Sequence, residues 1–322
     1  MRWVLPYIDQ PPAFWERVRD AVPGDEVTVY VPMPGASLGS GRPPQPDSHR
    51  ADFLAHGGVR VSVLLNPVVH EGSAEAVFET LRPSLENLVT EYGVAEAVVA
   101  SVGLARLIRE ALPDLGLSAS TLLEISTPAQ AVYLEGIFDS LTPSGRIVRD
   151  MRALAALKGA FPGRIRLMVN EGCLPGCVYR TQHFAEMNSG MPMPASLCAG
   201  LLEREPWLAL TGAWILPQHL DLFDGLYDEL KLDGRVTLAD PDRYLRVLRA
   251  YAERTSLALD EIGGGPATAV QVPAVTRAFY AHTLTCDKAC DRCEWCRTFY
   301  ASGGDARAGG PEAAARDEAP RS

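Results

Sequence analysis

The chain has 322 residues, 47% of them hydrophobic and 22% charged, which suits a globular protein with a large buried core. Its formal net charge of −10 argues against a nucleic-acid-binding surface, which needs clustered lysine and arginine. No stretch approaches the roughly 20 apolar residues of a membrane span, and no signal peptide is visible at the start. We therefore expect a cytoplasmic protein that binds neither membranes nor nucleic acid.

Short apolar runs rich in β-formers alternate with amphipathic helical patterns up to residue 285. This alternation indicates right-handed βαβ units and a parallel sheet. So many units favour a closed barrel over an open sheet, and no glycine-rich dinucleotide-binding turn follows the first strand. The predicted strands are 2–8, 26–32, 59–65, 96–101, 117–121, 138–141, 165–170, 211–216 and 229–232, and the main predicted helices are 74–92, 104–112, 128–135, 148–158 and 241–254.

The predicted fold class is α/β, a TIM-like (β/α) barrel with a cysteine-rich segment at its C-terminal end. We expect the barrel over residues 1–284, the cysteine-rich segment over 285–300 and a disordered tail over 301–322. The predicted strands exceed the eight of such a barrel by one, so one of them is an accessory strand or a false prediction. Residues 34–49 are rich in glycine, proline and serine and are predicted to form a long loop.

All seven cysteines lie in the second half of the chain, in two groups. A secreted disulfide scaffold is normally short, with an even number of cysteines spread along it, so disulfides are the weaker interpretation. In a reducing cytosol, clustered cysteines indicate metal ligation. The first group is Cys173, Cys177 and Cys198, and the second is Cys286, Cys290, Cys293 and Cys296.

The first group follows a predicted barrel strand, where the active face of such barrels lies. Cys173 and Cys177 share a Gly/Pro turn that lets two thiolates converge on one metal or cluster. Glu171 and His183 are acid/base candidates, and Arg180 is a cation for an anionic substrate. The alternative is structural, with Glu171 paired to Arg180 and His183 a buried histidine.

The second group places four cysteines in eleven residues, at spacings of three, two and two. Such compact runs are typical of iron–sulfur clusters. Structural zinc more often uses separated cysteine pairs or a Cys/His mixture. Because His282 is nearby, zinc at the C-terminal cysteines stays open as an alternative.

Two basic residues follow the last predicted strand. Lys231 and Arg235 are expected at the same rim as the mid-chain cysteines, where they would bind a carboxylate or phosphate. A salt bridge to Asp233 is the equally good alternative. Arg42, in a Gly-Ser-Gly-Arg loop, is a weaker substrate-binding candidate because such a loop can fold over a ligand.

These motifs resemble one branch of the peptidase U32 family. The resemblance is carried by the run 170–184, which begins Asn-Glu-Gly-Cys, and by Lys-Leu-Asp-Gly-Arg at 231–235. Tyr30 with the loop 39–42, the strand 118–121, the run 213–217 and the terminal cysteines agree with it. The peptidase name does not suit this sequence, because it has neither a His-Glu-x-x-His zinc motif nor a Gly-x-Ser-x-Gly elbow.

The resemblance implies a barrel with a cysteine-ligated [4Fe–4S] cluster. Family members are described as oxygen-independent hydroxylation factors in ubiquinone synthesis or in tRNA and ribosomal RNA modification, some with prephenate as the oxygen source. Other branches supply four mid-chain cysteine ligands, whereas this chain has three. Either a terminal cysteine completes one cluster, or three cysteines hold a cluster with an open iron and four hold a second.

The sequence therefore predicts an iron–sulfur enzyme that modifies a small anionic metabolite, by oxygen-independent hydroxylation or a related group transfer. An open iron could act as a Lewis acid or carry sulfide for sulfur transfer. The alternative from another class is a non-catalytic metal-binding scaffold or electron carrier, working with a redox or heterodimer partner.

Overall fold

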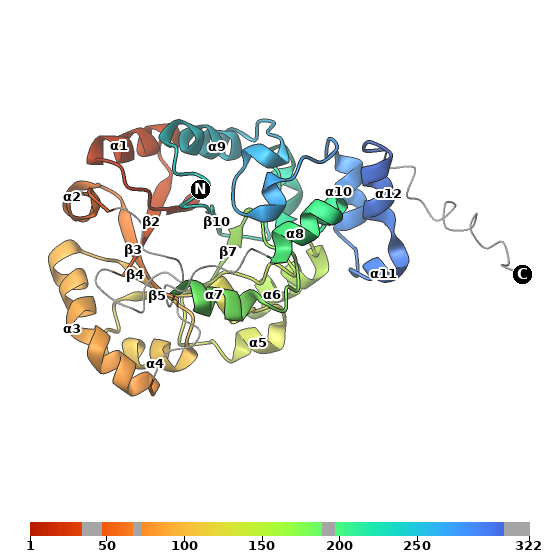
Figure 1. The fold of residues 1–322 in the computed structure, drawn as a ribbon. Coiled ribbons are helices and arrows are strands. Elements are labelled where there is room, and N and C mark those ends of the chain that lie inside the picture. The colour runs from red at the N-terminus through yellow and green to blue at the C-terminus, as the bar shows by residue number, and fades with distance from the viewer. Residues whose placement is uncertain (34–46, 67–71, 189–196, 306–322) are drawn as a thin grey trace, which may run out of the picture.

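Eight parallel strands close into a barrel, and helices surround it on the outside (Figure 1). The computed structural model describes residues 1–33, 47–66, 72–188 and 197–305. Neighbouring strands follow the order β1-β10-β7-β6-β5-β4-β3-β2, which confirms the predicted barrel. The barrel strands are β1 (Arg2–Pro6), β2 (Glu26–Pro32), β3 (Arg60–Leu65), β4 (Glu96–Val99), β5 (Gly116–Ala119), β6 (Ser140–Leu141), β7 (Arg164–Met168) and β10 (Glu229–Lys231).

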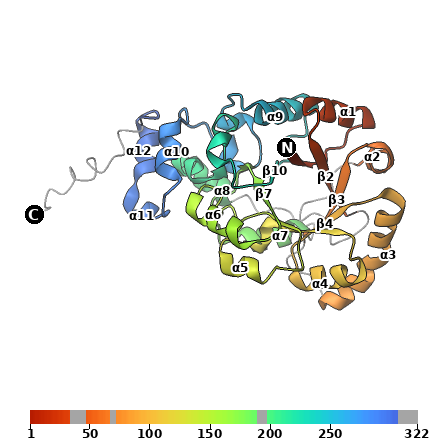
Figure 2. The same ribbon diagram turned by 180° about the vertical axis from the view of Figure 1, so that it is seen from behind.

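Helices between the strands cover the outer face, and α1 and α9 lie side by side in both views (Figures 1 and 2). The predicted helices 74–92 and 241–254 correspond closely to α3 and α9. The outer helices are α1 (Pro12–Ala21), α2 (Arg50–His56), α3 (Ala74–Tyr92), α4 (Val102–Ala111), α5 (Pro128–Val132), α6 (Met151–Ala160) and α9 (Pro241–Glu253).

Local sequence explains the limits of α3. The Ser73 side chain accepts a hydrogen bond from the backbone N–H of Ala76, which caps the N-terminus of the helix. Its apolar residues recur at helical spacing and pack on the barrel, as Leu81 and Leu85 do. Gly93 ends the helix with a φ of 63°, a left-handed conformation that suits glycine.

The surplus predicted strand is an accessory strand. Residues 211–216 contain only a short β9 (Ala213–Trp214), which pairs antiparallel with β8 (Asn170–Glu171) outside the barrel. Glu171 lies opposite Ala213 in this pair. The two-stranded sheet therefore fixes the backbone of Glu171 just beyond the carboxyl end of β7.

The C-terminal segment packs against one side of the barrel and contains α10 (Arg277–Thr283), α11 (Cys290–Cys293) and α12 (Trp295–Ala301) (Figure 1). Helix α12 and helix α8 (Leu197–Arg204) both contact the 3-10 turn η2 (Pro206–Thr211). Helix α7 (Arg180–Asn188) follows the mid-chain cysteine turn. Within the described residues, no helix combines the length and apolarity needed to cross a membrane.

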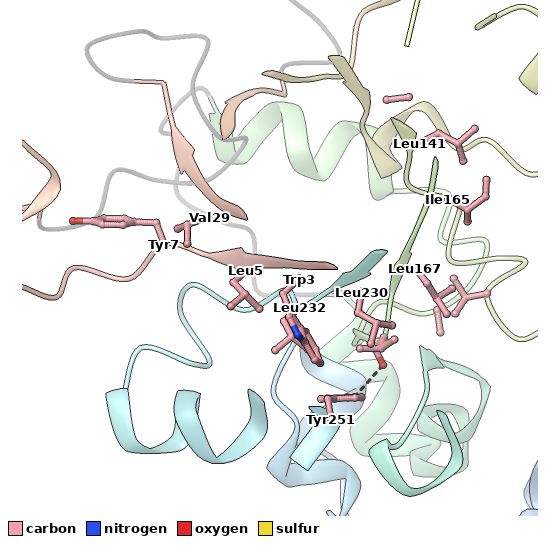
Figure 3. Close-up of a cluster of buried hydrophobic side chains, with 14 of the residues drawn as sticks. Trp3, Leu5, Tyr7, Val29, Leu141, Ile165, Leu167, Leu230, Leu232 and Tyr251 are labelled. Atoms are coloured by element: carbon pink, nitrogen blue, oxygen red, sulfur yellow. Dashed lines mark hydrogen bonds between the residues drawn. The ribbon is translucent and has the colours of Figure 1, made fainter. Parts of the chain in front are cut away.

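The core between strands and helices is apolar. Figure 3 shows Trp3, Leu5, Leu230 and Leu232 gathered on the helical side of β1 and β10, near Tyr251 of α9. The Tyr251 hydroxyl donates to the backbone carbonyl of Ile215 at 2.8 Å, which ties α9 to the strand region. This burial of apolar surface is the main stabilising term of the fold.

The barrel interior, by contrast, contains a buried ion network. Arg166 is 1% exposed and donates two hydrogen bonds to Glu96, at 2.9 and 2.8 Å. Its Nε donates to Glu229 at 2.6 Å, and Ser62 Oγ donates to Glu96 at 2.9 Å. A buried charge is tolerated only when it is paired and hydrogen-bonded, so this network holds β3, β4, β7 and β10 in register.

We predict that Arg166→Ala lowers the free energy of unfolding by roughly 3–5 kcal/mol, because it leaves the buried Glu96 carboxylate without a cation and leaves Glu229 with Arg164 alone. Arg2→Ala removes the half-exposed Arg2–Glu26 ion pair and should cost less than about 1 kcal/mol. Urea denaturation of both variants measures the difference. Equal losses would contradict a special role for the interior network.

Candidate functional site

A cavity of about 460 Å³ brings together cysteines from three distant parts of the chain. Its wall is formed by the loop 174–179 after β8, by α8, and by the segment 283–296, and we call it the cysteine cavity. The cysteines that line it are Cys177, Cys198, Cys286, Cys290 and Cys296. Thiols of the mid-chain and the terminal group thus line the same cavity, which the sequence spacing alone left open.

Two predicted ligands lie apart from this wall. Cys173 is not among the lining residues, and its charge instead acts on Arg180. Cys293 is exposed, with its Sγ 4.0 Å from Nε2 of His282. Their metal-ligating roles stay predictions.

Stacked aromatic rings hold the terminal cysteine run against the barrel. Trp214 of β9 stacks on Phe279 of α10, with ring centroids 5.9 Å apart. Trp295 of α12 lies against Phe279 at 5.8 Å and stacks on His282 at 4.1 Å. Because Trp295 lies between Cys293 and Cys296 in the sequence and is next to Cys296, its packing restrains the position of this run.

Tight backbone turns shape the cysteine run. Lys288 and Glu294 have φ angles of 60° and 47°, which non-glycine residues rarely adopt. The backbone N–H of Lys288 donates to Cys286 Sγ at 3.2 Å. Hydrogen bonds of this kind stabilise a thiolate, so the turn is suited to a metal-ligating cysteine.

Arg149 is the residue of the cavity that the sequence analysis missed. It is 3% exposed, and its Nη2 donates to the carbonyl of Leu210 at 2.6 Å. Its guanidinium lies over the rings of Trp214 and Phe279, at 4.7 and 5.5 Å from their centroids. Among the described residues, no carboxylate pairs with it, and its Nη1 has no hydrogen-bond partner.

Acidic groups near Arg149 are the Tyr280 hydroxyl and two thiols of the cavity. Burial lowers the pKa of Arg149, while Tyr280, Cys296 and Cys286 act in the opposite direction. Burial also raises the pKa of Cys296 to about 12, against the pull of Arg149. The metal-free Cys296 thiol therefore stays protonated at neutral pH and does not give the buried Arg149 a full counter-charge.

We tested whether these residues fit a thiolate-ligated cluster. All seven cysteines are free, and in the described part of the chain no three His, Cys, Asp or Glu side chains already form a metal-binding group. Metallation would deprotonate the thiols and draw them together. The resulting negative charge would supply what the unpartnered Nη1 of Arg149 lacks, so the donor set and its surroundings fit an anionic cluster.

A second polar site lies at the carboxyl end of the barrel, which we call the barrel mouth: Glu124, Glu171, Arg180, Lys231 and Asp233. Arg180 Nε pairs with Glu124 at 2.7 Å, and its Nη1 pairs with Glu171. Arg180 thus already binds two carboxylates. The Glu171–Arg180 pair is the one that the sequence analysis gave as the structural alternative. Its predicted role in substrate binding stays a prediction.

Glu171 is buried, at 2% exposure, and its Oε2 has no hydrogen-bond partner within the described residues. Burial raises its pKa, while Arg180 lowers it. A Cβ at Gly145 would come within 2.7 Å of Oε2, so only glycine fits there. His183 lines the cysteine cavity instead, so the two predicted acid/base residues are in different sites.

Lys231 closes the barrel mouth from β10. It is 6% exposed, and its Nζ lies 4.8 Å from the ring centroid of Tyr30. Burial, with a contribution from Arg166, lowers its pKa to about 8. Arg235 is half-buried just beyond β10. Arg42 lies outside the described residues.

The fold and the two sites define a (β/α)-barrel protein with polar groups at the carboxyl ends of its strands. Residues 48–138 match the model of Peptidase family U32. An uncharacterized protease of Methanocaldococcus jannaschii is 25% identical over 187 residues, and the chain spans about half of its length, 52% of each protein being aligned. The structure of the U32 peptidase Mk0906 aligns with a TM-score of 0.50 and 17% identity, covering 72% of this chain and 91% of that one, which supports the fold alone.

We predict that Glu171→Gln flattens the pH dependence of stability. Because burial raises the pKa of folded Glu171 above its ordinary value of 4.5, the folded state holds this proton more tightly than the unfolded state. The free energy of unfolding therefore falls as the pH rises from 4.5 through the raised pKa, and glutamine removes that loss.

Urea denaturation at a series of pH values from 4.5 upward measures how steeply the free energy of unfolding changes with pH in the wild type and in Glu171→Gln. Glu91→Gln, at an exposed position of α3, is the matched control and should keep the wild-type slope. An unchanged slope in Glu171→Gln would show that Glu171 is not held in its protonated form.

Proposed function

We propose that the protein is an iron–sulfur enzyme that modifies a small anionic metabolite by oxygen-independent hydroxylation or a related group transfer. The observation that carries this proposal is the cysteine cavity, where five cysteines lie around a buried arginine that has no carboxylate partner among the described residues. Arginine beside carboxylates would be an ordinary ion pair. Arginine beside thiols is suited to an anionic thiolate cluster.

Cys286, Cys290 and Cys296, with a fourth thiolate from Cys177 or Cys198 on the facing wall, would hold one [4Fe–4S] cluster. When bound, the cluster supplies redox or Lewis-acid chemistry to the site. Arg149 would balance the negative charge of the bound cluster. The packed aromatic rings around Trp295 would exclude water from one side of the cluster. The open part of the wall includes Tyr179 and His183, so a small molecule can approach the thiols from there.

At the barrel mouth, the residues of the chain bind the substrate and hold a proton. Lys231 and Arg235 are suited to an anionic group, and Lys231 has no ion pair of its own among the described residues. Burial raises the pKa of Glu171 above that of an ordinary glutamate, so its carboxyl is suited to give a proton to a substrate oxygen. Arg180 positions Glu171 through their ion pair.

A zinc-binding scaffold is the second candidate, and His282 favours it. The imidazole lies 4.0 Å from Cys293 Sγ, and a Cys/His mixture is the usual ligand set of structural zinc. In that case the protein would act with a partner and would not turn over a substrate itself. Metal analysis separates the two candidates, because the cluster gives iron with acid-labile sulfide and the scaffold gives zinc alone.

We predict that Arg149→Leu retains the cluster at least about tenfold less well than the wild type, as loss of a supporting residue does in other metal sites. Iron and sulfide per chain, measured after anaerobic reconstitution and gel filtration, report the effect. Arg149→Lys keeps the positive charge and should restore part of the content. Arg152→Leu, three residues away and exposed on α6, is the matched control and should behave as the wild type.

We predict a second result from the cysteines themselves, measured in the same way. Cys198→Ala and Cys290→Ala alter the mid-chain and the terminal thiols of the cysteine cavity separately. If each variant loses all iron, one cluster is shared between the groups, and if each loses half, two clusters are present. Full iron content in both variants would contradict cysteine ligation by either group.

A further inference from the structure

Lys231 occupies an unusual electrostatic position. It is the last residue of β10, and its side chain lies in the barrel interior between Tyr30 and the Arg166 network. Arg166 is a fixed cation whose carboxylate partners, Glu96 and Glu229, already bind it at 2.6–2.9 Å. Lys231 therefore faces a neighbouring positive charge whose counter-ions are engaged elsewhere.

The lysine also lacks a partner of its own. Its Nζ makes no ion pair or hydrogen bond with any residue in the described ranges, and its charged group contacts only the face of the Tyr30 ring. Lys158 shows the ordinary arrangement, since its Nζ contacts both carboxylate oxygens of Asp228 at 2.8 Å. A buried ammonium without a partner is costly, and loss of its proton relieves that cost.

This environment produces a nucleophilic amine. With its pKa lowered to about 8, Lys231 is neutral in a substantial fraction of molecules near neutral pH. Lysines beside another cation, or in a desolvated site, act in this way when they form Schiff bases with carbonyl substrates. The carboxyl end of a barrel strand is also where catalytic residues of such barrels lie.

We propose that Lys231 Nζ forms an imine with the carbonyl carbon of a small 2-oxo acid bound at the barrel mouth. The neutral amine attacks the carbonyl carbon, so that a C–N bond forms and the carbonyl opens to a hydroxyl. That hydroxyl takes a proton from Glu171 and leaves as water, and the nitrogen loses its remaining proton to the Glu171 carboxylate. The net change is amine plus ketone to imine plus water, with no oxidant or reductant.

The charge at Lys231 selects the substrate class. The protonated imine that precedes the last proton transfer is a cation in the same place as the ammonium. The nearby carboxylates of Asp233, Glu96 and Glu171 act on this position, but none of them pairs directly with it. A 2-oxo acid carries a carboxylate on the carbon next to the reacting carbonyl, so it brings a counter-charge with it. The inference rests on the proposed function in taking the barrel mouth as the substrate site, but it requires no iron.

Reductive trapping tests the proposal. The protein, purified in air and without reconstitution, is incubated with pyruvate or glyoxylate and sodium cyanoborohydride, which reduces an imine to a stable secondary amine. The lysines of the chain are Lys158, Lys231 and Lys288, so peptide mass spectrometry can compare all three sites. We expect the adduct at Lys231 to exceed that at Lys158 by at least about tenfold, because far more of the Lys231 amine is neutral.

The rate of trapping should rise with pH and level off above about 8, following deprotonation of Lys231. Lys231→Arg keeps the charge but should lose the adduct, whereas Lys158→Arg should keep it, with thermal unfolding confirming that both variants fold. Equal adducts on Lys158 and Lys231, or no adduct on a folded wild-type protein, would overturn the imine. The trapping experiment uses protein without reconstituted iron, so its failure would not contradict the cluster proposal. In the same way, a loss of iron in the cysteine variants would not contradict the imine.

Discussion

The buried charge of Arg149 is the constraint on which the organisation of this protein depends. Its guanidinium lies over the ring of Trp214, in the strand β9 beside the barrel, and over the ring of Phe279, in the C-terminal segment. Arg149 therefore joins these two parts of the molecule. A cation in such a position needs a negative partner, and the described residues offer thiols where a carboxylate is usual. The placement of the terminal cysteines and the retention of the proposed cluster would therefore both depend on this arginine.

The segment 170–184 links the two sites. Glu171 and Arg180 are at the barrel mouth, while Cys177 and His183, between and after them, line the cysteine cavity. A change in charge at the thiols therefore acts on residues that share a short backbone with the groups at the mouth. If the proposed cluster and substrate are bound, this arrangement would connect them through one short segment of backbone.

The barrel could be predicted from the sequence because short apolar runs alternate with amphipathic helical patterns, and this pattern shows which residues face the core. It also anticipated a surplus strand, which proved to be β9 beside β8. Helix α1 was not predicted. It is only ten residues long, begins at the second of two prolines and has just three buried apolar residues, Phe14, Trp15 and Val18. The predicted loop and the candidate Arg42 fall mostly outside the described residues.

The site was harder to predict than the fold. Spacing indicated that the cysteines bind metal, but only tertiary packing shows that Cys177 and Cys198 share a wall with Cys286. Nothing local distinguishes Arg149 from other arginines, since its role comes from Trp214 and Phe279 far along the chain. X-ray absorption at the iron edge of the anaerobically reconstituted protein tests the central claim most directly. The account predicts sulfur neighbours and short iron–iron contacts, whereas isolated iron bound by oxygen or nitrogen would contradict it.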